Sequence, residues 1–233
     1  MRGLLAKVYR DLVQRRLRTA LTILGVAVGV AGLLAITSTA RNVERVQRQL
    51  YASSSQADIE YWVWDAPPGL TQLLASDNRI ASAELRWVYH TKWRVGNRWV
   101  DLELVGLPDP SAASINTYEL VQGAWPASGE VLLDVSAATL GADAPLLLTP
   151  GMQLTYRDQN DRERTLTVSG LSRSPSYLSS SITKTAVGYV TSDLGQRLLG
   201  TAGGNMLLVK LVDPHDALDV NEHIVRLLRR QGI

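Results

Sequence analysis

The sequence predicts an α+β protein: one N-terminal transmembrane helix with a helical stalk, followed by a mixed α/β domain outside the cytoplasm. Residues 19–40 carry no charge and are rich in Leu, Ile, Val, Ala and Gly. About 20 such residues cross a bilayer core as a helix. Basic residues gather before this run, and strand and helix patterns separated by turns follow it.

The charge is divided sharply between these two parts. Residues 1–40 hold six basic side chains and one acidic one, which leaves 18 basic and 21 acidic residues for the remainder. The sequence pI near 9 therefore comes from a short N-terminal block. We expect no nucleic-acid partner, because no broad basic surface follows from this distribution.

The N-terminal arginines predict the topology. Positive charge beside an apolar span marks its cytoplasmic side. We take Arg10, Arg15, Arg16 and Arg18 as this topology signal, so residues after about 41 are expected across the membrane. A cleaved signal peptide is the alternative, but its apolar stretch would be shorter than this one. The absence of cysteine excludes disulfides, thiolate metal sites and a cysteine nucleophile.

Residues 1–18 are predicted to form a basic amphipathic helix on the cytoplasmic side. Leu4, Leu5, Val8 and Leu12 recur at helical spacing among basic residues. Such a helix suits an anionic lipid surface. The alternative is a charged flank that only extends the span.

Within the predicted span, small residues indicate helix packing. Gly25 and Gly29 form a small-xxx-small pair, and Gly32 lies close by. Small residues let a second membrane helix approach closely. The plainer alternative is glycine without a partner, since glycine is common in membrane helices.

After the span, residues 41–57 are predicted to form a helical stalk, with Val43, Val46 and Leu50 on one stripe. A serine run at residues 53–55 ends the stripe. The remaining chain alternates between strand and helix patterns. Strands are expected at 58–64, 83–95, 99–107, 131–134, 146–148, 153–157, 165–171, 186–191 and 206–212.

The turns and helices complete this domain. Gly96-Asn97 predicts a hairpin between two of the strands. The serine-rich stretch 172–183 is predicted to be a mobile surface loop. Helices are expected at 70–76, 192–199 and 215–230, with a short helical turn at 136–140.

No constellation of catalytic, metal-binding or cofactor-binding residues emerges. His90, His215 and His223 lie far apart, without a metal-ligand spacing. The Glu130/Asp134 pair fits turn and strand-edge roles equally well. There is no P-loop, and so no phosphate cradle for ATP in this chain.

Two further patterns favour structure over chemistry. Gly170-Leu-Ser172-Arg-Ser174 lacks the last glycine of a nucleophile elbow. Aromatic residues in the paired-strand region favour cross-strand packing over a binding face. These residues are Trp87, Tyr89, Trp93 and Trp99.

The membrane segment resembles a known family. The stretch from Arg18 to Val30, RTALTILGVAVGV, resembles the first transmembrane helix of MacB/FtsX-type ABC transporter permeases, with their R-x-x-L-T-x-L-G pattern. The later region resembles the family's periplasmic core domain. The supporting motifs are Gly123-Ala-Trp-Pro, Glu130-Val-Leu-Leu, Leu140-Gly, Gly151, Val168-Ser-Gly170 and Gly188-Tyr-Val-Thr.

This resemblance implies an organisation and a function. It implies a porter-like α+β subdomain from 58–110 and 172–233, with a mostly β subdomain inserted at 111–171. It also implies a bacterial inner-membrane location, further permease helices, a homodimer or heterodimer, lipid contact and a separate ABC ATPase that hydrolyses ATP. The chain itself would be no enzyme and would hold no cofactor, and would transmit ATP-driven movement to cargo or a periplasmic partner.

The sequence leaves one alternative open. A single-pass anchored, or secreted, envelope binding or adaptor domain would share this topology without a transport role. The sequence given stops about where a second membrane helix is expected, so the resemblance implies that the rest of the permease is encoded elsewhere or further on. The cargo is not predicted.

Overall fold

The computed structural model describes residues 20–21, 24–32, 55–142 and 144–233. The chain divides into two compact units, Met1–Gln49 and Leu50–Ile233. In the first unit, residues 20–21 and 24–32 are helical and exposed. No helix among the described residues has the length and apolar character needed to span a bilayer. The predicted helix at 1–18 and stalk residues 41–54 lie outside the described residues.

The second unit is a mixed α/β domain, as predicted. Its strands are β1 (Ile59–Ala66), β2 (Ile80–Val95), β3 (Arg98–Leu107), β4 (Glu119–Gly123), β5 (Glu130–Asp134), β6 (Gln153–Arg157), β7 (Glu163–Arg173), β8 (Thr185–Thr191) and β9 (Gly204–Leu211). Its α-helices are α3 (Gly69–Leu74), α4 (Ser180–Thr183), α5 (Ser192–Leu199) and α6 (Ala217–Gln231). Short 3-10 helices are η1 (Pro110–Ala112), η2 (Val135–Leu140) and η3 (Pro214–Asp216).

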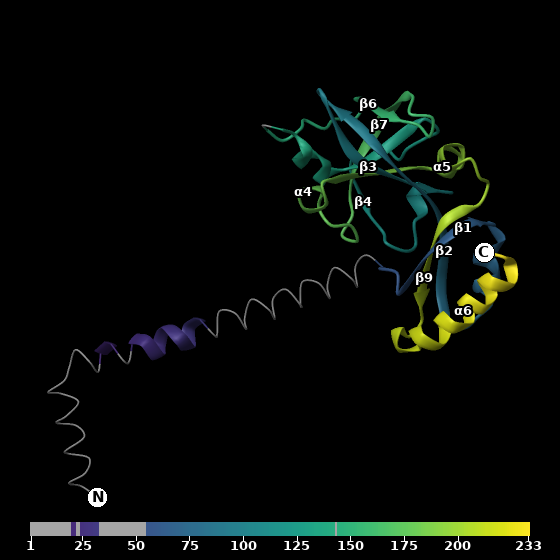
Figure 1. The fold of residues 1–233 in the computed structure, drawn as a ribbon, viewed down its shortest axis with the longest axis horizontal. Coiled ribbons are helices and arrows are strands. Elements are labelled where there is room, and N and C mark those ends of the chain that lie inside the picture. The colour runs from purple at the N-terminus through teal and green to yellow at the C-terminus, as the bar shows by residue number, and fades with distance from the viewer. Residues whose placement is uncertain (1–19, 22–23, 33–54, 143) are drawn as a thin grey trace, which may run out of the picture. The chain divides into compact units, whose positions relative to one another are not determined.

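The strands form one sheet in the order β1-β9-β2-β3-β8-β5-β7-β4, and β6 pairs with both β2 and β7. These pairings close a ring of β2, β3, β8, β5, β7 and β6. The β3–β8 and β5–β7 pairs are parallel, and the other pairs are antiparallel. Figure 1 shows β1, β2 and β9 beside α6, and β6 and β7 at the opposite end of the domain.

Strand β2 joins these two parts because it is long enough to serve both. Its first half pairs with β9, from Ile80 to Arg86, and its second half pairs with β3, from Trp87 to Val95. The predicted hairpin between β2 and β3 is confirmed. Gly96 adopts φ +58° in that turn, a conformation that glycine adopts without strain.

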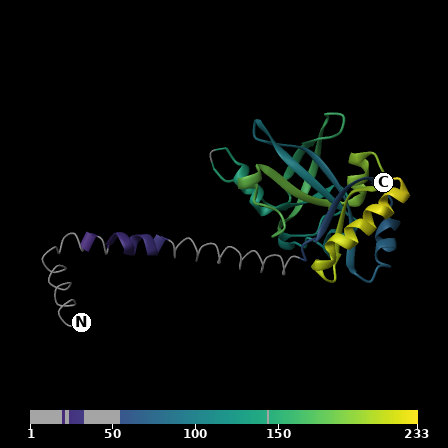
Figure 2. The ribbon, with the colours of Figure 1, turned by 60° about the horizontal axis from the view of Figure 1, so that its bottom comes forward.

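Separate apolar clusters stabilise the two parts. Helices α3 and α6 cover one face of β1, β9 and the start of β2, with Leu207, Val209 and Ile224 fully buried. The C-terminal helix α6, yellow in Figures 1 and 2, runs along this face. The second cluster fills the strand ring and includes Leu133 and Leu154, both inaccessible to solvent. Strand alternation produces both clusters, because every second side chain points to one face.

Two strand predictions were wrong. Residues 146–148 form no strand, since the Leu146 amide donates to the Ala138 carbonyl (2.7 Å) and holds the segment against η2. Strand β4 was not predicted, because it is short and its pattern does not alternate. It pairs with β7 alone.

The prediction of a mobile surface loop at 172–183 was also wrong. Strand β7 continues to Arg173, and residues 180–183 form α4. Ser172 and Ser180 are buried. The Ser136 and Ser180 hydroxyls are 2.9 Å apart, and the Ser174 amide donates to Asp134 Oδ2 at 3.1 Å. Serine-rich sequence favours loops only where water, rather than protein, satisfies its hydroxyls.

The proposed division into 58–110 with 172–233 and an inserted 111–171 stays a prediction. Strand β5, from the inserted part, pairs with β8 from the other part as well as with β7.

Candidate functional site

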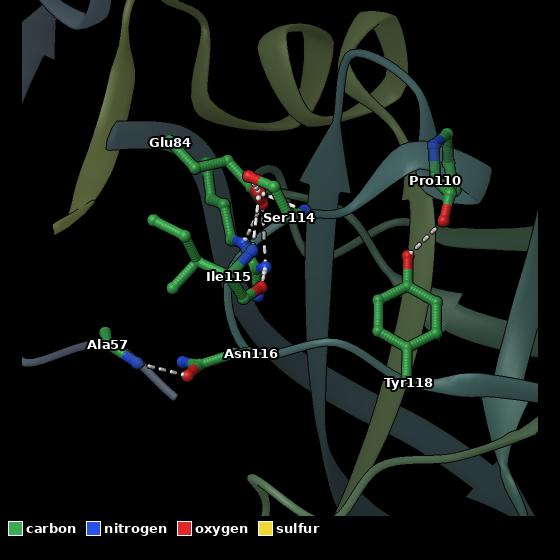
Figure 3. Close-up of polar contacts among 8 residues, drawn as sticks. Ala57, Glu84, Pro110, Ser114, Ile115, Asn116 and Tyr118 are labelled. Carbon is green, nitrogen blue, oxygen red and sulfur yellow. Dashed lines mark hydrogen bonds and ion pairs between the residues drawn. The ribbon is translucent and has the colours of Figure 1, made fainter. Parts of the chain in front are cut away.

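The most tightly bonded feature of the domain is the point where its described chain begins. Residues 55–58, which we call the joint, follow the predicted stalk, and residues 55–57 form no helix. Ser55 has a left-handed backbone, with φ +47°. The Asn116 amide donates to the Ser55 carbonyl at 3.1 Å, and the Ala57 amide donates to Asn116 Oδ1 at 2.9 Å. Figure 3 shows the Ala57 contact. One asparagine therefore binds the joint through both its backbone and its side chain.

Strand β9 holds the joint from a second side. Lys210 Nζ donates to the Gln56 carbonyl (2.9 Å) and to Asp58 Oδ1 (3.1 Å). The Leu211 amide donates to Asp58 Oδ2 at 2.8 Å. Asn116 is 59 positions from Ala57 in the sequence, and Lys210 is 154 positions from Gln56. The joint is thus fixed by distant parts of the chain.

Asn116 is itself positioned by an ion pair on β2. Glu84 Oε2 accepts hydrogen bonds from the backbone amides of Ser114 (2.9 Å) and Ile115 (3.3 Å). Arg86 donates through Nε to Glu84 Oε1 at 2.8 Å and through Nη2 to the Ile115 carbonyl. Figure 3 shows these bonds converging on the segment just before Asn116. A line of polar contacts therefore runs from β2 through residues 114–116 to the joint.

Arg86 is fully buried, with 0% of its surface exposed. Burial alone lowers its pKa, but the adjacent Glu84 carboxylate outweighs burial and the pKa is raised. The guanidinium is therefore permanently charged. Its Nη1 atom has no hydrogen-bond partner among the described residues. A buried charge is stable only with its partner, so Glu84 and Arg86 depend on one another.

Three tyrosines lie beside Arg86. The rings of Tyr118 and Tyr189 stack with centroids 3.7 Å apart, and the Tyr177 ring meets Tyr189 edge-on at 6.3 Å. The Tyr118 hydroxyl donates to the Pro110 carbonyl at 2.8 Å (Figure 3). Burial raises the pKa of all three phenols, so they stay protonated at neutral pH. They can donate hydrogen bonds but cannot serve as bases.

This arrangement suits holding rather than covalent chemistry. Its charges neutralise each other and its phenols keep their protons. Within the described ranges, no group of His, Asp and Glu gathers as a metal site would require. Polar networks of this kind fix a unique packing when most of their members are paired.

The predicted site residues contribute nothing to this network. Gly25, Gly29 and Gly32 lie in the first unit, where an added Cβ at each would meet no atom within 4 Å. Their role in helix packing therefore stays a prediction. The topology arginines at 10, 15, 16 and 18 lie outside the described residues.

The residues weighed for chemistry have structural contacts. Glu130 Oε2 accepts from the Ala127 amide, and Asp134 accepts from the amides of Ser136 and Ser174. Ser172 is buried inside β7 and is therefore no exposed nucleophile.

The histidines and tryptophans fit the plainer interpretations as well. His90 and His215 each lie beside one carboxylate, that of Glu103 (3.6 Å) and that of Asp213 (2.8 Å). Trp87 and Trp93 are buried, as cross-strand packing predicts.

The residues of the joint network were not singled out from the sequence. One signal was available: Glu84 and Arg86 stand two apart in the strand AELRWV, so both point to one face. Opposite charges at such positions indicate an ion pair. Nothing in the sequence shows that residues 114–116 cover that face.

The chain was compared with known proteins. A sequence model described as the MacB-like periplasmic core domain matches residues 19–227. No curated protein sequence matches the chain.

Three solved structures share the general arrangement. The periplasmic region of MacB from Actinobacillus actinomycetemcomitans is 14% identical, with 72% of this chain and 75% of that chain covered and a TM-score of 0.47. The extracellular domain of the noncanonical ABC-type transporter YknZ from Gram-positive bacteria is 10% identical, with 74% and 92% covered and a TM-score of 0.49. A domain of a putative permease from Porphyromonas gingivalis is 16% identical, with 72% and 71% covered and a TM-score of 0.45.

Proposed function

Because the chain belongs to the MacB-like periplasmic core domain family, we propose that it is the N-terminal part of a MacB/FtsX-type ABC transporter permease that transmits ATP-driven movement to its extracytoplasmic domain. In this proposal the N-terminus is cytoplasmic in a bacterial inner membrane and residues after about 41 lie outside. A partner ABC ATPase hydrolyses ATP, further permease helices complete the membrane part, and the permease works as a homodimer or heterodimer. The chain carries no catalytic step.

The observation that supports transmission is the bonding of the joint. Movement of a membrane helix reaches the domain only if the connecting residues are fixed to the sheet. Asn116 holds residues 55–57 on one side, and Lys210 and Asp58 hold the joint against β9 on the other. Coupling between distant sites is carried by such contiguous hydrogen-bonded contacts. A displacement of the joint would then move β2 and β9 together.

The test uses the permease and its ATPase reconstituted in nanodiscs, with a spin label in the exposed 158–162 loop of each protomer. We expect ATP to change the distance between the labels in the wild-type protein. Asn116→Ala removes the side-chain bond to Ala57 and should reduce this change by at least half. Asn205→Ala is the matched control, because Asn205 makes equivalent side-chain bonds to the Val88 backbone away from the joint.

Two results would contradict the proposal. Equal ATP-dependent changes in Asn116→Ala and the wild type would mean that the joint does not carry the movement. An unchanged distance in the wild type, or a chain that assembles with no ATPase, would favour the alternative of an anchored or secreted envelope binding or adaptor domain.

A further inference from the structure

Strand β1 exposes two tryptophans at the edge of the sheet. It ends the strand order and pairs with β9 alone among the described strands. Its outward residues include Trp62, 59% exposed, and Trp64, 80% exposed. The alternate residues Ile59, Tyr61 and Val63 pack under the helices instead. We call Glu60, Trp62, Trp64, His90 and Glu103 the tryptophan surface.

These tryptophans are the unusual feature of the exposed surface. A single exposed apolar residue needs no explanation, but adjacent large aromatic side chains on one face indicate a contact site. The Trp62 ring lies 6.0 Å from the His90 ring, so the aromatic surface continues from β1 onto β2. Tryptophan is also the residue most enriched at the energetic centres of interfaces.

Acidic side chains border the tryptophans. Glu60 is exposed, and it lies close enough to Glu103 to raise the pKa of that carboxyl, a shift caused mainly by burial. The hydrogen bond from Tyr177 and the charge of His90 oppose this shift. In the described part of the chain, neither carboxylate forms an ion pair with Lys or Arg. The surface therefore combines two exposed indole faces with unneutralised negative charge.

A second copy of this strand fits poorly here. Antiparallel pairing of two β1 strands about Trp62 and Val63 would place Glu60 of one copy opposite Asp65 of the other, at both ends. Like charges directly opposite each other destabilise a strand pair. The missing charge is positive, so it must come from a different chain.

We propose that the tryptophan surface docks an extended, Lys- or Arg-bearing segment of a partner protein along the edge of β1. A sheet edge offers backbone donors and acceptors to an added strand. A Lys or Arg side chain over an indole face, beside a carboxylate, gains cation–π and Coulomb attraction. This inference rests on the proposed function, since it names the chemistry of the extracytoplasmic partner.

The test measures binding of synthetic peptides to the purified full chain by fluorescence anisotropy. One dye-labelled heptapeptide alternates Lys and Val, and the control peptide has Glu in place of Lys. We expect the Lys peptide to bind at least about tenfold more tightly, the effect of roughly 1.4 kcal/mol. It should also slow amide hydrogen exchange in residues 59–64. Raised salt should weaken binding, because exposed charges are screened.

Three variants separate the contributions. Trp62→Thr/Trp64→Thr keeps strand-favouring residues and should weaken the Lys peptide about tenfold or more. Glu60→Lys should have a similar effect through charge alone. Leu218→Ser is the matched control, since Leu218 is an equally exposed apolar residue (81%) on α6, and it should bind as the wild type does.

Several outcomes would overturn the inference. They are equal binding of the two peptides, unweakened binding by Glu60→Lys, and binding without slower exchange in β1. If the double tryptophan variant unfolds, Glu60→Lys and the exchange data decide. None of these results touches Asn116, so a failed peptide test leaves the ATP-dependent distance change to judge the proposed function separately.

Discussion

The two faces of β1, β9 and the first half of β2 are built differently. One face lies against α3 and α6 and is almost wholly apolar, with Leu85, Leu207 and Val209 buried. The other carries Glu84 and Arg86, covered by the segment that leads to Asn116. The helix-covered face gives the domain its stability. The charged face determines how the chain is attached to the sheet, so removing the charges should harm attachment as well as stability.

The largest effect is expected from Arg86→Met. Removing one member of a buried ion pair leaves Glu84 charged and unpaired, which costs about 3–5 kcal/mol. Adding Glu84→Gln removes that charge and still lets the side chain accept from Ser114, so the double variant should recover more than half of the loss. Urea unfolding measures both. A loss below about 1 kcal/mol in the single variant would mean that the pair is not essential.

Ile224→Ala tests the helix-covered face. Ile224 is fully buried on α6, and truncation of such a residue costs about 2–4 kcal/mol. The free energy of unfolding should fall while the joint keeps its protection from hydrogen exchange under native conditions. Faster exchange confined to the joint in this variant would mean that the two faces do not act separately.

Gly195→Ala tests how closely α5 packs on β2. A Cβ at Gly195 would lie 2.5 Å from the Trp87 Cβ, which forces helix and strand apart. Overpacking of this kind costs about 1–3 kcal/mol. Gly69→Ala is the control, because a Cβ there meets nothing within 4 Å. Thermal unfolding should separate the two variants, and equal melting temperatures would contradict the close packing.

The smallest effect is expected at Asp193, an exposed charge near the start of α5. Hydrogen bonds from Thr191 and Ser128, and the guanidinium of Arg197, lower its pKa to about 2, against a small opposing effect of burial. A lowered pKa means that the charged form stabilises the fold above about pH 4 and that this contribution disappears as the pH falls toward 2.

Asp193→Asn should therefore destabilise the domain by about 0.5 kcal/mol at pH 7, a value typical of exposed pairs. It should have no effect near pH 2. Urea unfolding at both pH values measures this, and a pH-independent difference would assign the effect to packing. The contrast with Arg86 isolates the role of burial.

Local patterns predicted much of the fold. The β2–β3 hairpin, α5 and the C-terminal helix follow from turn residues and periodicity that neighbouring residues supply. The serine-rich segment failed because Asp134 and Ser136, far away in the sequence, bind its amides and a hydroxyl. Composition describes what a segment prefers alone, and tertiary partners can override it.

The joint shows the same limit more strongly. Its residues Gln56 and Asp58 look like ordinary polar residues before a strand. Their meaning depends on Lys210 and Asn116, which approach only when β9 and the segment after β3 are in place. Glu84 and Arg86 could have been recognised as an ion pair from their spacing. Which segment the pair holds could not.

The most direct test of the account is hydrogen exchange at the Ala57 amide, whose acceptor is Asn116 Oδ1. Arg86→Met and Ile224→Ala are compared with the wild type under native conditions. The account predicts faster Ala57 exchange in Arg86→Met, because the segment that positions Asn116 loses its anchor, and a wild-type rate in Ile224→Ala. Unchanged Ala57 exchange in Arg86→Met would contradict the account.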